Sequence, residues 1–283
     1  VFTDYTSDEK YIAKDSVRYG NMIFFAKEKI KVSPKILADA IFIKRDDVFR
    51  DQDRIDTYNR FSSLRVFEYP DIRYQPDPRT EKDNDLIANV FLTPKKRFGF
   101  SPNFEVSQSN IQDFGIGLNT SFLARNALGL ADVLELSFRA NLGSSREIAN
   151  TQDQIFNINE IGGNLSLSLP KIVFPFAKKL FKRNNTQPFT RFTYGFSTQR
   201  NIGLDRQNHT FKFEYNWNPN RKTSKGLSLL DIQFVNNLNA DNYFNIFTNS
   251  YNELNDISQD NLGQVNPEFV NDNNDLIIPS GTD

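Results

Sequence analysis

From residue 96 to residue 236, apolar and polar side chains alternate one by one along successive long stretches. In RFGFSPNFEVS, for example, Phe98, Phe100 and Phe104 fall on one face, while Asn103 and Glu105 fall on the other. A period of two is typical of a β-strand with one apolar and one polar face. The same period returns in DFGIGLNTSFLAR, VLELSFRANLG, EIGGNLSLSLP, PFTRFTYGFST, TFKFEYNWN and GLSLLDIQFVN, which gives seven predicted strands in a row.

Two architectures produce this alternation. A soluble antiparallel sandwich has strands of roughly five or six residues, whereas these stretches are about twice as long. Their polar faces hold isolated charges and small residues, and Tyr215 and Trp217 near one strand end fit an interfacial aromatic girdle. The alternation therefore favours an antiparallel transmembrane β-barrel with its phenylalanines toward lipid, and the soluble all-β module remains the alternative.

Composition narrows the possible functions. The chain holds 27 Phe, 10 Tyr and 1 Trp, yet its mean hydropathy is −0.55, as expected when lipid-facing and polar positions alternate. The chain has no Cys and a single histidine, His209, which we expect in a loop. Acidic pairs such as Asp46 and Asp47 therefore have no partner histidine for acid–base catalysis. We therefore expect no enzyme, no catalytic residue, no cofactor and no metal. The net charge is −1, and the single basic stretch, at 177–185, suits lipid headgroups or plain solvation. We therefore expect no nucleic-acid partner either.

The residues before this region predict a small α+β unit. Residues 17–30 are typical of a strand, and Ser33 followed by Pro34 is typical of a helix start. The segment 66–75 and the segment 85–92 close the unit as two further strands, which gives the order β-α-α-β-β. The two helices are predicted from apolar residues at helical spacing, namely Ile36, Leu37, Ala40 and Ile41 in the first, and Ile55, Tyr58, Phe61 and Leu64 in the second.

Three short motifs follow one another along the chain, and their order is informative about the family: LRVF at 64–67, GIG at 115–117 and RNALG at 125–129. A β-α-α-β-β unit with such a Leu-x-x-Phe stretch between its second helix and the next strand, followed by a Gly-x-Gly strand and an Arg-Asn-x-x-Gly turn, resembles the BamA/TamA-type outer-membrane assembly proteins. The Phe-rich strands resemble their Bacteroidetes branch. The resemblance covers about residues 18–280. It implies a polypeptide-transport-associated (POTRA) domain in the periplasm, followed by a barrel in the bacterial outer membrane.

The predicted organisation has four parts. Residues 1–17 are a tail or the end of a preceding module, 18–94 the POTRA domain, 95–236 the first seven barrel strands, and 237–283 an acidic Asn-rich extracellular loop. From residue 236 to the end there are 13 Asn and eight acidic residues but no Lys or Arg, which predicts a solvated loop. Because single-chain bacterial barrels have an even number of strands, seven strands predict a fragment of a larger, incomplete barrel.

By resemblance, the whole protein would insert or fold other outer-membrane proteins, or export a passenger. Its partners would be nascent outer-membrane proteins, the lipid bilayer, and periplasmic or lipoprotein accessory subunits. A passive pore or transporter remains the alternative. Pro102 fits a strand at an edge or seam, and equally a local bulge. The predicted seam strand comprises Arg97, Phe98, Gly99, Phe100, Ser101, Asn103 and Phe104. The predicted POTRA edge strand comprises Val66, Phe67, Glu68, Tyr69, Ile72 and Tyr74.

Overall fold

The computed structural model describes residues 1–5, 11–79, 85–108, 114–144, 156, 158–173, 188–201, 204–220 and 222–238. The basic stretch 177–185 and the predicted loop beyond Leu238 lie outside these residues. Neither helix in the described ranges is long and apolar enough to cross a membrane. The elements are β1 (Asp15–Tyr19), β2 (Met22–Ala26), α1 (Pro34–Asp39), α2 (Asp51–Ser63), β3 (Asp71–Pro76), β4 (Leu86–Phe91), β5 (Phe98–Ser107), β6 (Phe114–Arg125), β7 (Val133–Ser144), β8 (Ile158–Leu169), β9 (Phe189–Asn201), β10 (Leu204–Asn220) and β11 (Thr223–Asn237).

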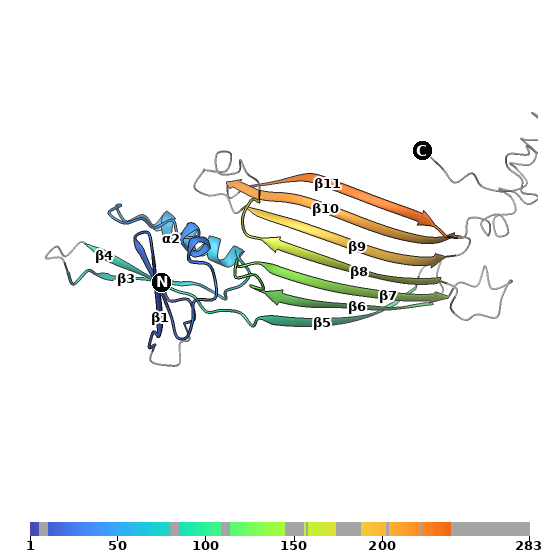
Figure 1. Ribbon diagram of the computed structural model, residues 1–283, viewed down its shortest axis with the longest axis horizontal. Helices are drawn as coiled ribbons and strands as arrows, with labels where there is room; N and C mark the ends of the chain where they lie inside the picture. The colour runs from blue at the N-terminus through green and yellow to red at the C-terminus, as the bar shows by residue number, and fades with distance from the viewer. Residues whose placement is uncertain are drawn as a thin grey trace, which may run out of the picture.

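The seven predicted long strands are confirmed, and they form one sheet in the order β11-β10-β9-β8-β7-β6-β5. Each strand pairs antiparallel with its neighbour in sequence, so the sheet is an uninterrupted meander that extends away from the N-terminal unit (Figure 1). β5 has 10 residues and β10 has 17. β5 and β11 form the two edges of this sheet.

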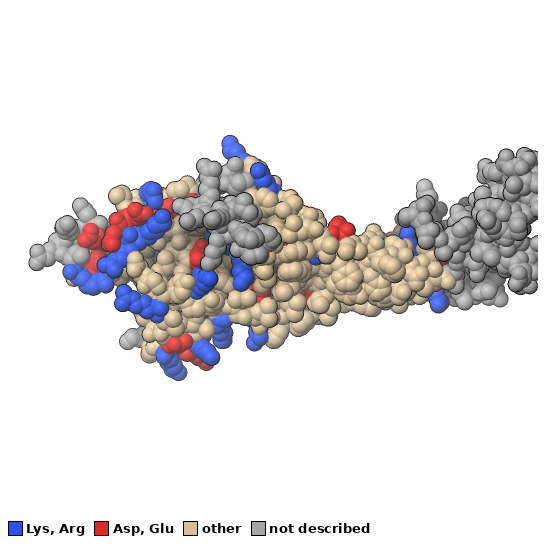
Figure 2. Space-filling view, turned by 45° about the horizontal axis from the view of Figure 1, so that its top comes forward, with Lys and Arg blue, Asp and Glu red and all other residues tan. Residues whose placement is uncertain are grey.

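The sheet has one apolar and one polar face, as the alternation predicts. Large apolar side chains stand exposed on the apolar face, with Phe104 77% and Phe138 44% accessible. Residues of the opposite parity, such as Gly117 and Asn141, lie on the polar face as direct cross-strand partners. In the view of Figure 2, charged side chains gather over the N-terminal unit and are sparse over the sheet. A sheet that exposes a whole face of Phe, Leu and Ile is suited to an apolar medium.

The N-terminal unit, residues 1–95, is built on a sheet of two hairpins, β1-β2 and β3-β4. Residues 1–5 lie between them, because Phe2 bridges Phe25 on one side and Phe91 on the other. The rings of these three phenylalanines stack in a row. The prediction of a single strand at 17–30 is wrong, since Gly20 adopts a φ of +59° and turns the chain back into a hairpin.

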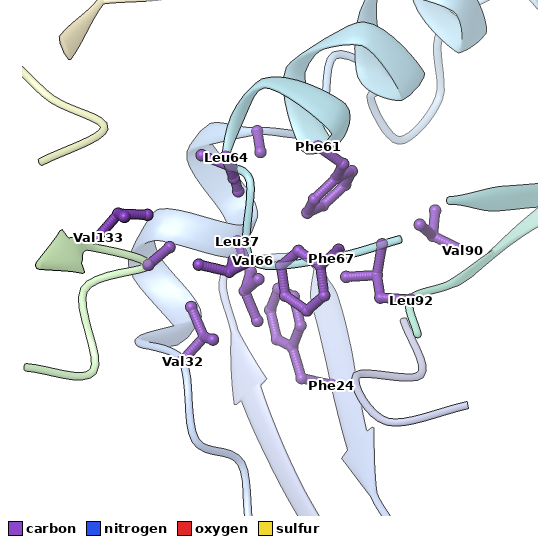
Figure 3. Packing of buried hydrophobic residues seen from close by; sticks show 12 residues of the cluster. Phe24, Val32, Leu37, Phe61, Leu64, Val66, Phe67, Val90, Leu92 and Val133 are labelled. Carbon is purple, nitrogen blue, oxygen red and sulfur yellow. The ribbon is translucent and has the colours of Figure 1, made fainter. Parts of the chain in front are cut away.

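Both helices of this unit pack onto the sheet around Phe24, Phe61 and Phe67, as Figure 3 shows. The predicted face of α2 is only partly right. Phe61 and Leu64 are buried, but Tyr58 is exposed, while the polar residues Asp56, Thr57 and Arg60 are buried instead. The Thr57 hydroxyl accepts a hydrogen bond from the Phe42 amide and donates one to the Asp53 carbonyl, so this buried polar group has partners both as donor and as acceptor.

Candidate functional site

The turn between β6 and β7, residues 126–132, joins the sheet to the N-terminal unit. Ala131 is 1% and Val133 5% accessible, and both belong to the hydrophobic cluster of the N-terminal unit. Figure 3 shows Val133 at the end of its strand, beside Leu37 and Val66. Two hydrogen bonds fix the contact: the Ser33 amide donates to the Gly129 carbonyl at 2.8 Å, and Asn126 Nδ2 to the Lys31 carbonyl at 3.0 Å. We call residues 126–132 the docking turn.

Asp132 organises the docking turn from inside. Its fully buried carboxylate accepts three backbone amides: Ala127 at 3.1 Å, Leu128 at 3.0 Å and Leu130 at 3.3 Å. Asn126 completes the turn. Its side-chain Oδ1 accepts the backbone amide of Ala131, and its backbone amide donates to the Asp132 carbonyl. A carboxylate that collects several amides is the stronger, charge-assisted kind of acceptor. The docking turn is therefore preorganised before it meets the N-terminal unit.

Three residues of the docking turn have a positive φ: Asn126 (54°), Gly129 (74°) and Ala131 (52°). Asn and Gly adopt this left-handed region readily, whereas Ala is strained there. Gly129 also approaches the N-terminal unit closely, because a Cβ added to it would lie 3.4 Å from the Lys31 carbonyl oxygen. The RNALG motif of the sequence is thus the part of the chain that makes this contact, with its Asn and its Gly in the two positions that need them.

Arg60 of α2 makes a second contact between the N-terminal unit and the sheet. Its guanidinium donates to the carbonyl of Pro170, just after β8, at 2.6 Å. Only 8% of Arg60 is accessible, and this burial lowers its pKa to about 10. At the end of β6, Arg125 Nη1 donates to the carbonyl of Lys96, in the short connection between the N-terminal unit and β5, at 2.9 Å. The sheet is therefore held to the N-terminal unit at the ends of β6 and β8 as well as through the chain itself.

The predicted seam strand is β5, which pairs with β6 and with no other strand of the described residues. The Arg125 amide donates to the Arg97 carbonyl, so Arg97 and every second residue after it direct their backbone groups to β6. The even-numbered residues from Phe98 to Val106 consequently direct theirs to the open side. Pro102 is one of them and lies opposite Thr120 in an unshifted register, so the alternative of a local bulge is wrong. Its missing N–H interrupts the open edge and leaves the pairing with β6 whole.

The second open edge belongs to β11. All its residues are exposed on both faces, and a register shift after Phe213 in β10 inserts an extra residue on the β11 side. Because the meander has an odd number of strands, β5 and β11 run in the same direction, away from the N-terminal unit (Figure 1). These two edges cannot pair with each other in the antiparallel manner of the rest of the sheet.

The polar face is lined by asparagines that lie over glycines of the neighbouring strand. A Cβ added to Gly117 would be 2.8 Å from Asn141 Oδ1, and one added to Gly195 would be 2.6 Å from Asn164 Oδ1. The same pairing recurs between Gly226 and Asn216. Charges on this face also pair across strands, as Arg139 with Glu160 at 2.8 Å and Lys212 with Asp231 at 3.0 Å.

The residues of the predicted POTRA edge are distributed over two segments. Val66 and Phe67 are buried in the core, and Glu68 donates its amide to the Thr93 carbonyl, while Tyr69 is 83% exposed. The strand β3 begins only at Asp71 and pairs with β4. Because the Asp77 amide donates to the Asp85 carbonyl, the N–H groups of Ile72 and Tyr74 are directed away from β4.

A shallow groove runs between α2 and the free side of β3. It is lined by Arg54, Ile55, Tyr58, Pro70, Asp71 and Ile72. Its walls are partly apolar and its rim carries both signs of charge, with Arg54 paired to Asp51 and Arg73 to Asp71. An extended segment beside the start of β3 would meet apolar side chains there, with charges of both signs at the rim.

His209 lies within β10 and not in a loop, which corrects the prediction. Its Nδ1 is 3.1 Å from the Tyr194 hydroxyl on the apolar face of the sheet. Within the described part of the chain, no three His, Cys, Asp or Glu side chains gather in a way that could hold a metal ion. The candidate sites are thus strand edges and a docking turn. Sequence reasoning missed the role of Asp132, although the Asn-Gly-Asp content of 126–132 is a turn signal.

No protein-family model matches the sequence, and no curated protein matches it. Among solved structures, CdiB from Acinetobacter baumannii is similar at 12% identity and a TM-score of 0.35, covering 75% of this chain and 48% of that chain. BamA from Haemophilus ducreyi lacking POTRA domains 1–3 is similar at 11% identity and a TM-score of 0.33, covering 76% and 52%. The chain therefore spans about half the length of these two structures.

Proposed function

We propose that this chain is part of an outer-membrane factor that assembles, inserts or translocates proteins without a chemical step. In this proposal the sheet is one side of a transmembrane barrel, with its apolar face toward lipid. The N-terminal unit is a periplasmic POTRA domain at the entrance. Clients are nascent outer-membrane chains, and the sequence resemblance of the LRVF, GIG and RNALG motifs supports this assignment.

The observation that carries the proposal is the open side of β5. This strand starts directly after the N-terminal unit and offers backbone groups from Phe98 to Val106 to a further strand. An incoming chain in extended conformation gains main-chain hydrogen bonds by pairing with such an edge, whatever its side chains are. In hydrocarbon this pairing is strongly favoured, because each unsatisfied backbone group there costs several kcal/mol.

The free side of β3 offers the same pairing before the client reaches the membrane. The amides of Ile72 and Tyr74 are directed away from β4, and Ile72 also lines the groove beside α2. A client held there as an added strand stays extended and close to β5. The docking turn and Arg60 would keep the two edges in a fixed relation during the transfer.

The test uses the full-length protein with a photo-crosslinking amino acid at Ser101 or Asn103 of β5, and at Ser166 of β8 as the matched control. All three side chains lie on the polar face, but only β5 is an edge. We expect nascent outer-membrane chains to be captured from β5 and not from Ser166. Equal capture at all three positions would contradict templating at the edge.

A second experiment separates this function from a passive pore. A disulfide that locks β5 to the final strand of the full-length barrel should stop growth under oxidising conditions and restore it under reducing conditions. A pore with a closed wall would tolerate the lock, and it would also give a single-channel conductance that the lock leaves unchanged. Normal growth of the locked protein would therefore refute the proposal.

A further inference from the structure

The chain leaving β8 folds back over the apolar face of the sheet. Two hydroxyl groups of the wall hold residues 170–173 there, and we call this segment the strap. Thr190 Oγ1 donates to the Lys171 carbonyl at 2.6 Å and accepts the Val173 amide at 3.0 Å. The Tyr215 hydroxyl donates to the Val173 carbonyl at 2.8 Å. Thr190 is fully buried and Tyr215 is 5% accessible, although neighbouring residues of the same face stand exposed.

The register places these anchors on the apolar face. Thr190 pairs with Leu169 and Tyr215, and it has the same parity in β9 as Phe192, which stacks on Phe213. Leu169, Thr190 and Tyr215 therefore form a row of the apolar face near the N-terminal unit, and only β10 and β11 continue past it, with Trp217 and Lys225. The strap lies on the outside of the wall and not across its polar face.

Thr190 breaks the apolar pattern of β9, and the strap explains why. A backbone group that packs against an apolar surface without a hydrogen-bond partner costs free energy, so an irregular segment there needs partners from the wall. Here the wall itself supplies two hydroxyl donors, to the carbonyls of Lys171 and Val173, and one acceptor, for the Val173 amide. The arrangement satisfies a non-helical backbone on a membrane-facing surface.

Basic and aromatic residues belong to the strap and to the strand ends of β10 and β11 on this face. Lys171 and Val173 are exposed. Trp217 has the same parity in β10 as Tyr215, and its direct partner in β11 is Lys225. Trp and Tyr prefer the boundary between headgroups and acyl chains, and lysines there extend their ammonium toward phosphates. The residues that follow the strap, 174–187, lie outside the described residues and carry four basic residues and no acid.

We infer that the strap, with Trp217 and Lys225, is a membrane-interface site that binds the headgroup of an anionic phospholipid. Lys171 and Lys225 provide the positive charge, while Val173 and Trp217 contact the upper acyl chains. The occupant is a phospholipid because the site combines two ammonium groups with apolar contact on a lipid-facing wall. This inference rests on the proposed membrane location and adds the ligand that the wall would bind near the N-terminal unit.

Depth-dependent quenching tests the position of the strap. In the full-length protein in phosphatidylcholine vesicles, a fluorophore is attached at Val173→Cys, at Phe138→Cys on the apolar face, and at Ser166→Cys on the polar face. We expect nitroxide lipids labelled near the headgroup to quench Val173 most, lipids labelled deep in the chain to quench Phe138 most, and neither to quench Ser166. If Phe138 is quenched but Val173 behaves like Ser166, the interface site is refuted while the proposed membrane location stands. If Phe138 is not quenched, the membrane location itself fails.

The anionic preference is tested with spin-labelled phosphatidylglycerol against spin-labelled phosphatidylcholine at the protein surface. One lysine near an anionic surface contributes about 1 kcal/mol, or about fivefold, so Lys171→Ala should lower the preference for phosphatidylglycerol by up to about fivefold. Lys212→Ala removes the same charge from the polar face and should leave the preference unchanged. An unchanged preference in Lys171→Ala would overturn the assignment of an anionic headgroup.

The hydroxyl anchors give a separate readout. Thr190→Val and Tyr215→Phe keep the shape of each side chain and remove its hydrogen bonds to the strap. Both should move the Val173 fluorophore toward water and reduce its quenching by headgroup-labelled lipid. Thr193→Val, on the polar face of the same strand, is the control and should not. Unchanged quenching in both anchor variants would contradict the strap as the element that places Val173.

Discussion

Replacing Asp132 by Ala should weaken the docking of the N-terminal unit more than any other single change in the docking turn. The buried carboxylate of Asp132 accepts the amides of Ala127, Leu128 and Leu130, and Ala131 beside it lies in the core of the N-terminal unit. A buried donor left without an acceptor costs roughly 1–3 kcal/mol. Three such donors, partly relieved by water that enters the space of the carboxylate, give an expected loss of about 3 kcal/mol. Asp132→Asn keeps one acceptor oxygen and should cost about 1 kcal/mol.

The loss can be measured by guanidinium unfolding of the full-length protein in vesicles, followed by near-ultraviolet circular dichroism and by protease cleavage between the N-terminal unit and β5. In Asp132→Ala the first unfolding transition should move to a lower guanidinium concentration than in the unchanged protein. Cleavage near Lys95 should also begin at a lower concentration. Asp231→Ala is the matched control, because this carboxylate is half exposed and pairs with Lys212 at the surface of the sheet. It should change stability by less than about 1 kcal/mol. An Asp132→Ala protein as stable as the control would refute the account of the docking turn.

Three further outcomes follow from the sheet. Phe138→Arg, on the apolar face, should cost about 2–4 kcal/mol of folding free energy in vesicles if it lies near the bilayer midplane, and Ser137→Arg much less; equal costs would contradict the lipid-facing assignment. Gly117→Ala should destabilise through its clash with Asn141, and a Gly117→Ala, Asn141→Ala double variant should recover part of the loss; strict additivity of the two would refute the contact. Protease added to intact cells should cut within 237–283 and spare 40–90, since β11 ends at the far end of the sheet from the N-terminal unit; the reverse pattern would refute this topology.

The sequence was sufficient to predict the strands of the large sheet, their order and their two faces. A period of two is a local signal, and a meander adds no information beyond the order of the strands. The facing of Phe104 and Phe138 follows directly from it. The helix start at Pro34 was equally local, because it depends on the fixed φ of proline.

What could not be predicted depends on contacts between distant segments. Arg60 is buried where the carbonyl of Pro170, distant in sequence, accepts its guanidinium, and periodicity within α2 pointed to Tyr58 instead. Asp132 accepts amides of its own turn, but Ala131 beside it packs into the core of the N-terminal unit, and no local pattern indicates that contact. Residues 1–5 are a similar case, since a segment of five residues has no pattern of its own until it is placed between Phe25 and Phe91.

Because of Pro102, the open edge of β5 offers fewer backbone N–H donors than carbonyl acceptors. Every second residue from Phe98 to Val106 offers a carbonyl to the open side, but Pro102 offers no amide. A strand that pairs there can donate at each position, yet one of its own carbonyls, opposite the middle of β5, finds no donor. If the sheet crosses a membrane as we propose, that carbonyl without a donor costs several kcal/mol, and the level of Pro102 is the depth at which a paired strand is held most weakly. Separation of any strand from this edge should therefore start at the level of Pro102 and spread toward both ends.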